Sequence, residues 1–68
     1  MDLVNTKRID RIVKLIDDRM VLQRGHTTFY PDEEYRSIIL SNEGEKEVLV
    51  YGEIFSGKEF ENEFKIIR

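Results

Sequence analysis

Residues 47–55 read Glu-Val-Leu-Val-Tyr-Gly-Glu-Ile-Phe, and this stretch decides how the fold is built. β-Branched and aromatic side chains dominate it, so we predict one strand over the whole stretch. Successive side chains of a strand point to opposite faces. The apolar positions are Val48, Val50 and Ile54 on one face, and Leu49, Tyr51 and Phe55 on the other. Both faces of this strand are therefore apolar, and each needs to be covered.

The segment after this strand predicts a hairpin. Residues 56–57, Ser-Gly, suit a two-residue turn. Residues 59–67 then alternate between charged side chains and mostly apolar ones, and this period of two predicts a second strand. Phe60, Phe64 and Ile67 also fit the i, i+4, i+7 spacing of a helix, so a C-terminal helix is the alternative.

The segment before residue 47 predicts a further strand. Residues 35–41 are rich in aliphatic side chains, and residues 42–45, Asn-Glu-Gly-Glu, are a turn cluster that connects them to the next strand. Residues 31–34, Pro-Asp-Glu-Glu, predict another turn or a very short helix. Residues 26–30 favour β structure and are a candidate edge strand.

The N-terminal third predicts an amphipathic helix. Its apolar residues recur at helical spacing and fall on one stripe: Ile9, Ile12, Val13, Ile16 and Met20. Asn5 or Asp2 is the expected N-cap, and the helix is expected to end between residues 18 and 25. If Asn5 is the cap, Lys7 and Arg8 lie in the first turn, where positive charge opposes the helix dipole.

These segments predict a single α+β domain over residues 1–68, with the N-terminal helix packed on a three-stranded antiparallel β-meander. Residues 26–30 are a candidate fourth strand. A domain of this size buries only about 60% of its unfolded surface, so a partner chain would help to stabilise it. One helix covers one face of the sheet. The second face is expected to be covered by residues 21–30, by a second copy of the chain or by another protein.

One segment, residues 52–58, matches the pattern G-x-x-x-x-G-K of phosphate-binding loops. In such a loop the backbone N–H groups hold phosphates, and the next residue is a Ser or Thr whose hydroxyl binds Mg²⁺. Here the next residue is Glu59, whose charge repels phosphate. We therefore predict no nucleotide site in this segment.

Residue types that catalyse reactions or bind metals are scarce. The chain has no cysteine and a single histidine, His26, so thiolate and polyhistidine metal sites are excluded. Acid–base catalysis by paired carboxylates needs one of them in an apolar pocket, whereas the acidic residues here lie in predicted turns and strand faces. We predict no catalytic, cofactor-binding or metal-binding residue, no small-molecule substrate and no enzymatic activity.

Binding is the function that the sequence favours. We expect a cytoplasmic protein–protein interaction module, such as a small adaptor, inhibitor or regulator, that self-associates as a homodimer. No apolar run approaches the ~20 residues of a membrane span. The predicted interface combines apolar side chains with an acidic rim: Tyr35, Leu49, Tyr51, Glu53, Phe55, Glu59, Glu61 and Glu63.

A second hypothesis is contact with nucleic acid. Residues 1–28 carry a net charge of +2, and four basic side chains of the predicted helix are its candidate phosphate contacts: Lys7, Arg8, Arg11 and Lys14. Residues 29–68 carry −5, and the pI of the chain is about 5.1. Nucleic-acid-binding domains usually have a basic overall balance, so this hypothesis is second to protein binding.

Overall fold

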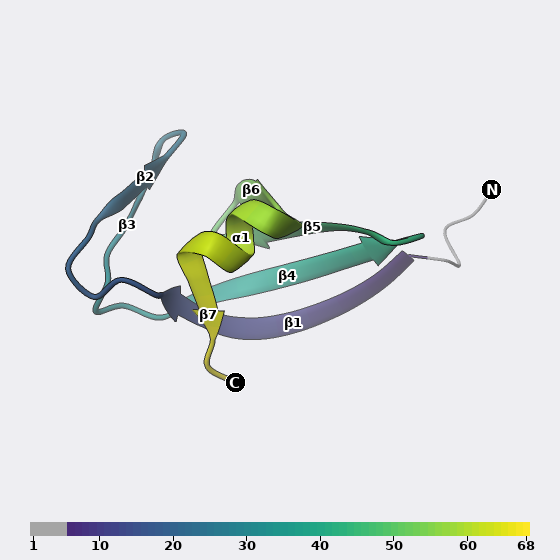
Figure 1. The fold of residues 1–68 in the computed structure, drawn as a ribbon, viewed down its shortest axis with the longest axis horizontal. Helices are drawn as coiled ribbons and strands as arrows, with labels where there is room; N and C mark the ends of the chain where they lie inside the picture. Colours follow the sequence, from purple (N-terminus) through teal and green to yellow (C-terminus); the bar gives the residue numbers. More distant parts are fainter. Residues whose placement is uncertain (1–5) are drawn as a thin grey trace.

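A computed structural model describes residues 6–68 of the chain. They are mostly β: a five-stranded antiparallel sheet that curls into a half-barrel, a separate hairpin and one short helix (Figure 1). In spatial order the sheet consists of β6 (Glu53–Ser56), β5 (Glu45–Val50), β4 (Tyr35–Asn42), β1 (Thr6–Leu15) and β7 (Phe64–Ile66). The hairpin is β2 (Leu22–Arg24) with β3 (Thr27–Phe29), and the helix is α1 (Gly57–Glu63). The predicted α+β fold is therefore wrong.

The predicted N-terminal helix is wrong because its segment forms β1. β1 pairs with β4 from Thr6, opposite Asn42, to Val13, opposite Tyr35. Most of its apolar residues are β-branched, which favours a strand. The strand also keeps its cations away from a helix N-terminus, where they would be unfavourable. The two predicted caps, Asp2 and Asn5, lie outside the described residues.

A tight turn divides the stretch that was predicted as one strand over residues 47–55. Tyr51 and Gly52 have φ values of 53° and 89°, and Val50 pairs with Glu53 across them. Two central residues with positive φ make a type I′ turn, which suits the twist of a hairpin. Glu43 and Gly44, with φ of 52° and 86°, form the same kind of turn, so the predicted turn at residues 42–45 is confirmed.

The predicted Ser-Gly hairpin turn is instead the start of α1. The Ser56 hydroxyl accepts a hydrogen bond from the Glu59 N–H at 3.1 Å, and the Glu59 carboxylate accepts one from the Ser56 N–H at 2.9 Å. This reciprocal capping box stabilises a helix N-terminus. The predicted strand over residues 59–67 is therefore wrong as far as Glu63. The alternative helix forms there, and only β7 is extended.

The core lies on the inner side of the curled sheet. Both α1 and the β2–β3 hairpin contribute to it, and its centre is Phe29, whose ring is fully buried. Phe29 contacts three other rings edge-on, those of Tyr35, Phe64 and Phe55, at centroid distances of 5.0, 5.5 and 5.9 Å. Residues 21–30 thus do cover one face of the sheet. The other, outer face is not covered by any of residues 6–68.

Candidate interaction surface

The outer face of the sheet carries a row of aliphatic side chains. The strand register places Ile38 of β4 opposite Leu49 of β5, and Leu49 opposite Ile54 of β6. Ile12 of β1 lies on the same face, because its neighbours Val13 and Leu15 alternate with it and point into the core. Ile12, Ile38 and Leu49 are half-buried, and Ile54 is 56% exposed. These four residues form what we call the outer apolar row.

Charged side chains flank the outer apolar row. Arg36 pairs with Ile12, and Lys14 pairs with Lys65, so all three cations alternate onto the outer face. Arg8 lies there too and makes an exposed ion pair with Asp10 at 3.1 Å. A shallow groove of about 530 Å³ runs between Arg8, Arg36 and the apolar row.

Tyr51 marks the end of this groove. It occupies the first position of the type I′ turn with φ of 53° and is 70% exposed. A bulky residue in the left-handed region is strained, and such strain often accompanies a functional position. The ring of Tyr51 contacts Tyr35 edge-on at 6.0 Å.

The structure does not bring the predicted apolar interface residues onto one face. Tyr35 and Phe55 are 8% and 1% exposed and belong to the core. Phe55 points inward because the turn at residues 51–52 reverses the alternation after Val50, and Tyr35 lies on the same face of β4 as the buried Ile39. Leu49 is on the outer face, and Tyr51 projects from the turn beside it. Two of the four predicted apolar contacts are therefore available to a partner.

The predicted acidic rim lies on the side of α1 and β6, and three of its four members have partners within the chain. Glu53 accepts a hydrogen bond from the Thr27 hydroxyl at 2.8 Å. Glu61 is 3.3 Å from the Lys46 ammonium group. Glu59 binds Arg24, and Glu63 is exposed. These carboxylates fasten the hairpin and helix to the sheet rather than surround Leu49.

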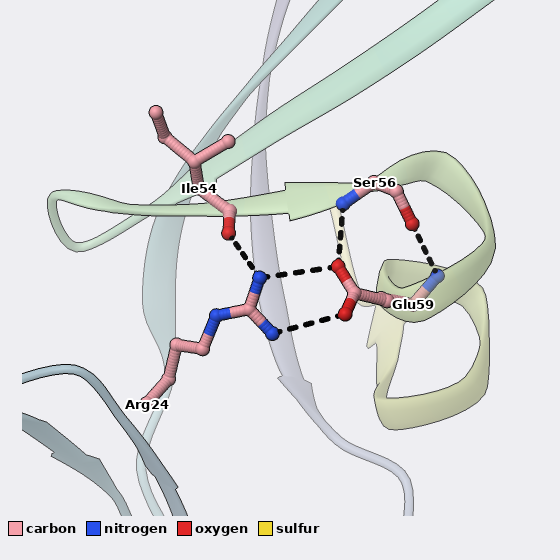
Figure 2. A network of polar contacts seen from close by, with 4 residues as sticks. All are labelled: Arg24, Ile54, Ser56 and Glu59. Carbon is pink, nitrogen blue, oxygen red and sulfur yellow. Dashed lines mark hydrogen bonds and ion pairs between the residues drawn. The ribbon is translucent and has the colours of Figure 1, made fainter.

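The Arg24–Glu59 contact is the centre of a polar network (Figure 2). The guanidinium donates two hydrogen bonds of 3.1 Å to the Glu59 carboxylate and one of 2.7 Å to the Ile54 carbonyl oxygen. It also lies over the Phe55 ring, 4.6 Å from its centroid. The Arg24 contact, together with the Ser56 N–H, lowers the pKa of Glu59 to about 2, and the same contact raises the pKa of Arg24. This network holds β2 against α1.

The four basic residues of the nucleic-acid hypothesis are divided between two faces of β1. Arg8 and Lys14 alternate onto the outer face with Ile12, whereas Lys7 and Arg11 fall on the opposite side with Val13. The expected common helix face does not exist. The described residues therefore offer no continuous phosphate-binding surface made of these four side chains.

Of the residues on or beside the outer face, only Leu49, Tyr51 and two cations of the nucleic-acid hypothesis, Arg8 and Lys14, were predicted from the sequence as contact residues. Ile12 was assigned to a helix, and Ile54 was placed with Val48 instead of Leu49. A signal was present in the dipeptide Tyr51-Gly52, because Gly is favoured at the second position of a type I′ turn. If Tyr51-Gly52 is taken as a turn, Ile54 falls on the same face as Leu49, as the structure shows.

Two further features complete the description of the surface. Over residues 6–68, no helix is long and apolar enough to cross a membrane. In the same part of the chain, no three His, Cys, Asp or Glu side chains come together in a way that suits a metal ion. Comparisons of the chain with protein families, with curated proteins and with solved structures found no match.

Proposed function

We propose that this protein is a non-enzymatic protein–protein interaction module and that its outer sheet face binds a segment of a partner protein. The observation that carries the proposal is the outer apolar row, a contiguous set of aliphatic side chains that nothing in residues 6–68 covers. Contiguous apolar patches with polar rims on small proteins typically mark interaction sites. The strained and exposed Tyr51 at the end of the groove is consistent with a contact residue.

The chemistry of the rim specifies the partner. Four cations, Arg8, Lys14, Arg36 and Lys65, share the outer face with three carboxylates, Asp10, Glu45 and Glu47. A segment with apolar side chains for the row and acidic side chains for the arginines would be complementary to this surface. We therefore propose an apolar, acidic peptide segment as the occupant.

Binding suits this groove better than catalysis does. Its charged lining consists of arginines, which carry only hydrogen-bond donors, and of Asp10, which is exposed and paired with Arg8. Neither provides a group poised to exchange a proton with a substrate. The proposal includes a cytoplasmic location, which the lack of cysteine suits.

Selection of peptides from a random display library on the immobilised protein tests the proposal. We expect enriched peptides that combine aliphatic or aromatic residues with Asp and Glu. By titration calorimetry, Leu49→Lys should weaken their binding at least about tenfold, because it places a charge in the apolar row. The control is Val21→Lys, which adds the same charge at an exposed apolar residue outside the groove.

Two results would contradict this function. One is a selection without enriched sequences, and the other is equal binding to wild type and to Leu49→Lys. If single-stranded DNA binds instead, with affinity that falls steeply as salt rises, the nucleic-acid hypothesis replaces protein binding.

A further inference from the structure

The N-terminal half of β1 has an unpaired edge. Even-numbered residues of β1 turn their backbone N–H and C=O groups away from β4, as the hydrogen bonds of Ile12 show. The Ile12 N–H donates to the Arg68 carbonyl oxygen at 2.9 Å, and the Ile12 carbonyl oxygen accepts from the Ile67 N–H at 2.8 Å. β7 pairs only with residues 13–15. Among the described residues, none pairs with this edge over residues 6–11. The backbone groups of Arg8 and Asp10 on this edge therefore have no partner within residues 6–68.

The opposite edge of the sheet is protected. β6 is the last strand on that side, and its Ile54 carbonyl oxygen accepts a hydrogen bond of 2.7 Å from Arg24. The β2–β3 hairpin thus supplies a side chain that blocks one sheet edge. Within residues 6–68, no side chain forms an equivalent hydrogen bond with the exposed edge of β1.

The exposed edge is complementary to itself in one antiparallel register. If two copies pair about a two-fold axis at Ile9, Arg8 of each copy lies opposite Asp10 of the other copy. Both pairs are formed by residues whose backbone groups face the edge, so each pair exchanges two hydrogen bonds. Ile9, which is 43% exposed, meets Ile9 of the second copy between them. Opposite charges and apolar residues facing each other stabilise such pairing.

Neighbouring registers are unfavourable. A shift that keeps the even-numbered residues in hydrogen-bonding positions moves the axis to Arg8 or to Asp10, and either one then faces its own copy. Like charges directly opposite each other destabilise a sheet. The charge sequence Arg-Ile-Asp over residues 8–10 therefore selects the register centred on Ile9.

We propose that a second copy of this chain pairs antiparallel with the β1 edge about a two-fold axis at Ile9, so that two five-stranded sheets become one. The side chains of Arg8 and Asp10 lie on the outer face, and they form a four-charge cluster across the axis. Homodimers with two-fold symmetry are the commonest oligomers, and strand addition at a sheet edge is a common form of recognition. This dimer forms through the backbone edge of β1, whereas the peptide groove lies on the outer face of the sheet, and the two share the side chains of Arg8 and Asp10. The pairing of the edges does not depend on the proposed peptide binding.

One pair limits the affinity. In this register Lys7 of each copy lies opposite Arg11 of the other copy, so the dimer contains two such pairs. These like charges lie on the inner side of the strands and weaken the pairing. The dimer is accordingly expected to be concentration-dependent, and Lys7→Glu should strengthen it, because two opposite-charge pairs then replace two repulsive ones.

Sedimentation equilibrium from micromolar to millimolar protein tests the dimer. Arg8→Asp and Asp10→Arg should each weaken association at least about tenfold, because each replaces two attractive pairs by two repulsive ones. The double variant Arg8→Asp/Asp10→Arg should regain wild-type association, because the charges are exchanged and the net charge is unchanged. Lys7→Glu should tighten association about fivefold.

Amide hydrogen exchange supplies a second readout. The N–H groups of Arg8 and Asp10 should become protected as the protein concentration rises, while that of Ile9, which faces β4, is protected throughout. Leu49→Lys should leave dimerisation unchanged, which separates this proposal from the peptide groove. A monomer at millimolar concentration, or a double variant that fails to regain association, overturns the proposal. A dimer whose association is unchanged by Arg8→Asp and by Asp10→Arg also overturns the proposal.

Discussion

At the scale of single residues, Tyr51 combines strain with exposure. It adopts φ of 53°, which costs an L-residue about 1 kcal/mol, although most of its ring is in solvent. The turn itself does not favour a tyrosine there, since an Asn-Gly or Gly-Gly pair suits the type I′ turn better, and the contact of its ring with Tyr35 leaves most of the ring exposed. A contact with a partner would explain it.

Replacement of Tyr51 by asparagine separates these roles. We expect Tyr51→Asn to raise the free energy of unfolding by about 0.5–1 kcal/mol, because Asn tolerates the left-handed conformation. Urea denaturation followed by circular dichroism measures this, with Tyr51→Phe as a control that keeps the ring and the strain. A loss of more than about 1 kcal/mol in Tyr51→Asn would mean that the contact with Tyr35 stabilises the fold.

At the scale of secondary-structure elements, β1 shows where sequence reasoning fails. Apolar residues at positions 9, 12, 13 and 16 fit a helical stripe, and the same segment also offers Val13 and Leu15 to one face of a strand. A short segment with apolar residues at both spacings is ambiguous by periodicity alone. The pairing with β4 decides the outcome, and that contact lies more than twenty residues away along the chain.

Local sequence signals predict the structure where one residue fixes the backbone conformation. The turn at residues 42–45 was predictable because Gly44 and its polar neighbours favour it. The same kind of turn at Tyr51-Gly52 was missed because tyrosine is a strand former. The helix after Ser56 was also within reach, since Ser56 and Glu59 have the spacing of a capping box.

The contact between β2 and α1 predicts a dependence of stability on pH. Arg24 lowers the pKa of Glu59 to about 2 in the folded protein, below its ordinary value of 4.5. The unfolded chain therefore binds more protons than the folded one between these values, and stability falls as pH falls. The contribution of Glu59 is complete above about pH 5 and is lost as pH decreases toward 2.

Glu59→Gln measures this contribution. Gln keeps the capping position but removes the ion pair with Arg24. The difference in the free energy of unfolding between wild type and Glu59→Gln should be constant from pH 7 to about 5 and should shrink below that. Glu61→Gln, which removes the same charge at an exposed carboxylate of α1, controls for net charge. A difference that is the same at pH 7 and pH 3 would show that the Arg24 contact does not act in solution.

At the scale of the whole molecule, the core is concentrated toward one end of an elongated sheet. The molecule measures 43 × 25 × 17 Å, and α1 and the hairpin lie over the end where β1 finishes and β4 begins (Figure 1). At the other end, residues 7–11 and 42–47 are exposed. The sequence predicted apolar side chains on both faces of the sheet, and Leu49 and Val50 do point to opposite faces, although a turn divides the predicted strand. Which face residues 21–30 cover was not, because it depends on the turn at residues 51–52 and on long-range packing.

This arrangement predicts an uneven response to the loss of apolar side chains. Phe29→Ala removes the ring at the centre of the core, which typically costs about 3–5 kcal/mol. A domain of this size has a total stability on the order of 5 kcal/mol, so the variant should be largely unfolded at 25 °C by circular dichroism. Ile9→Ala, at the exposed end of β1, should cost less than about 1 kcal/mol. If Phe29→Ala unfolds cooperatively with a loss below 2 kcal/mol, the hairpin is an accessory to the core, and the sheet with α1 is stable without it.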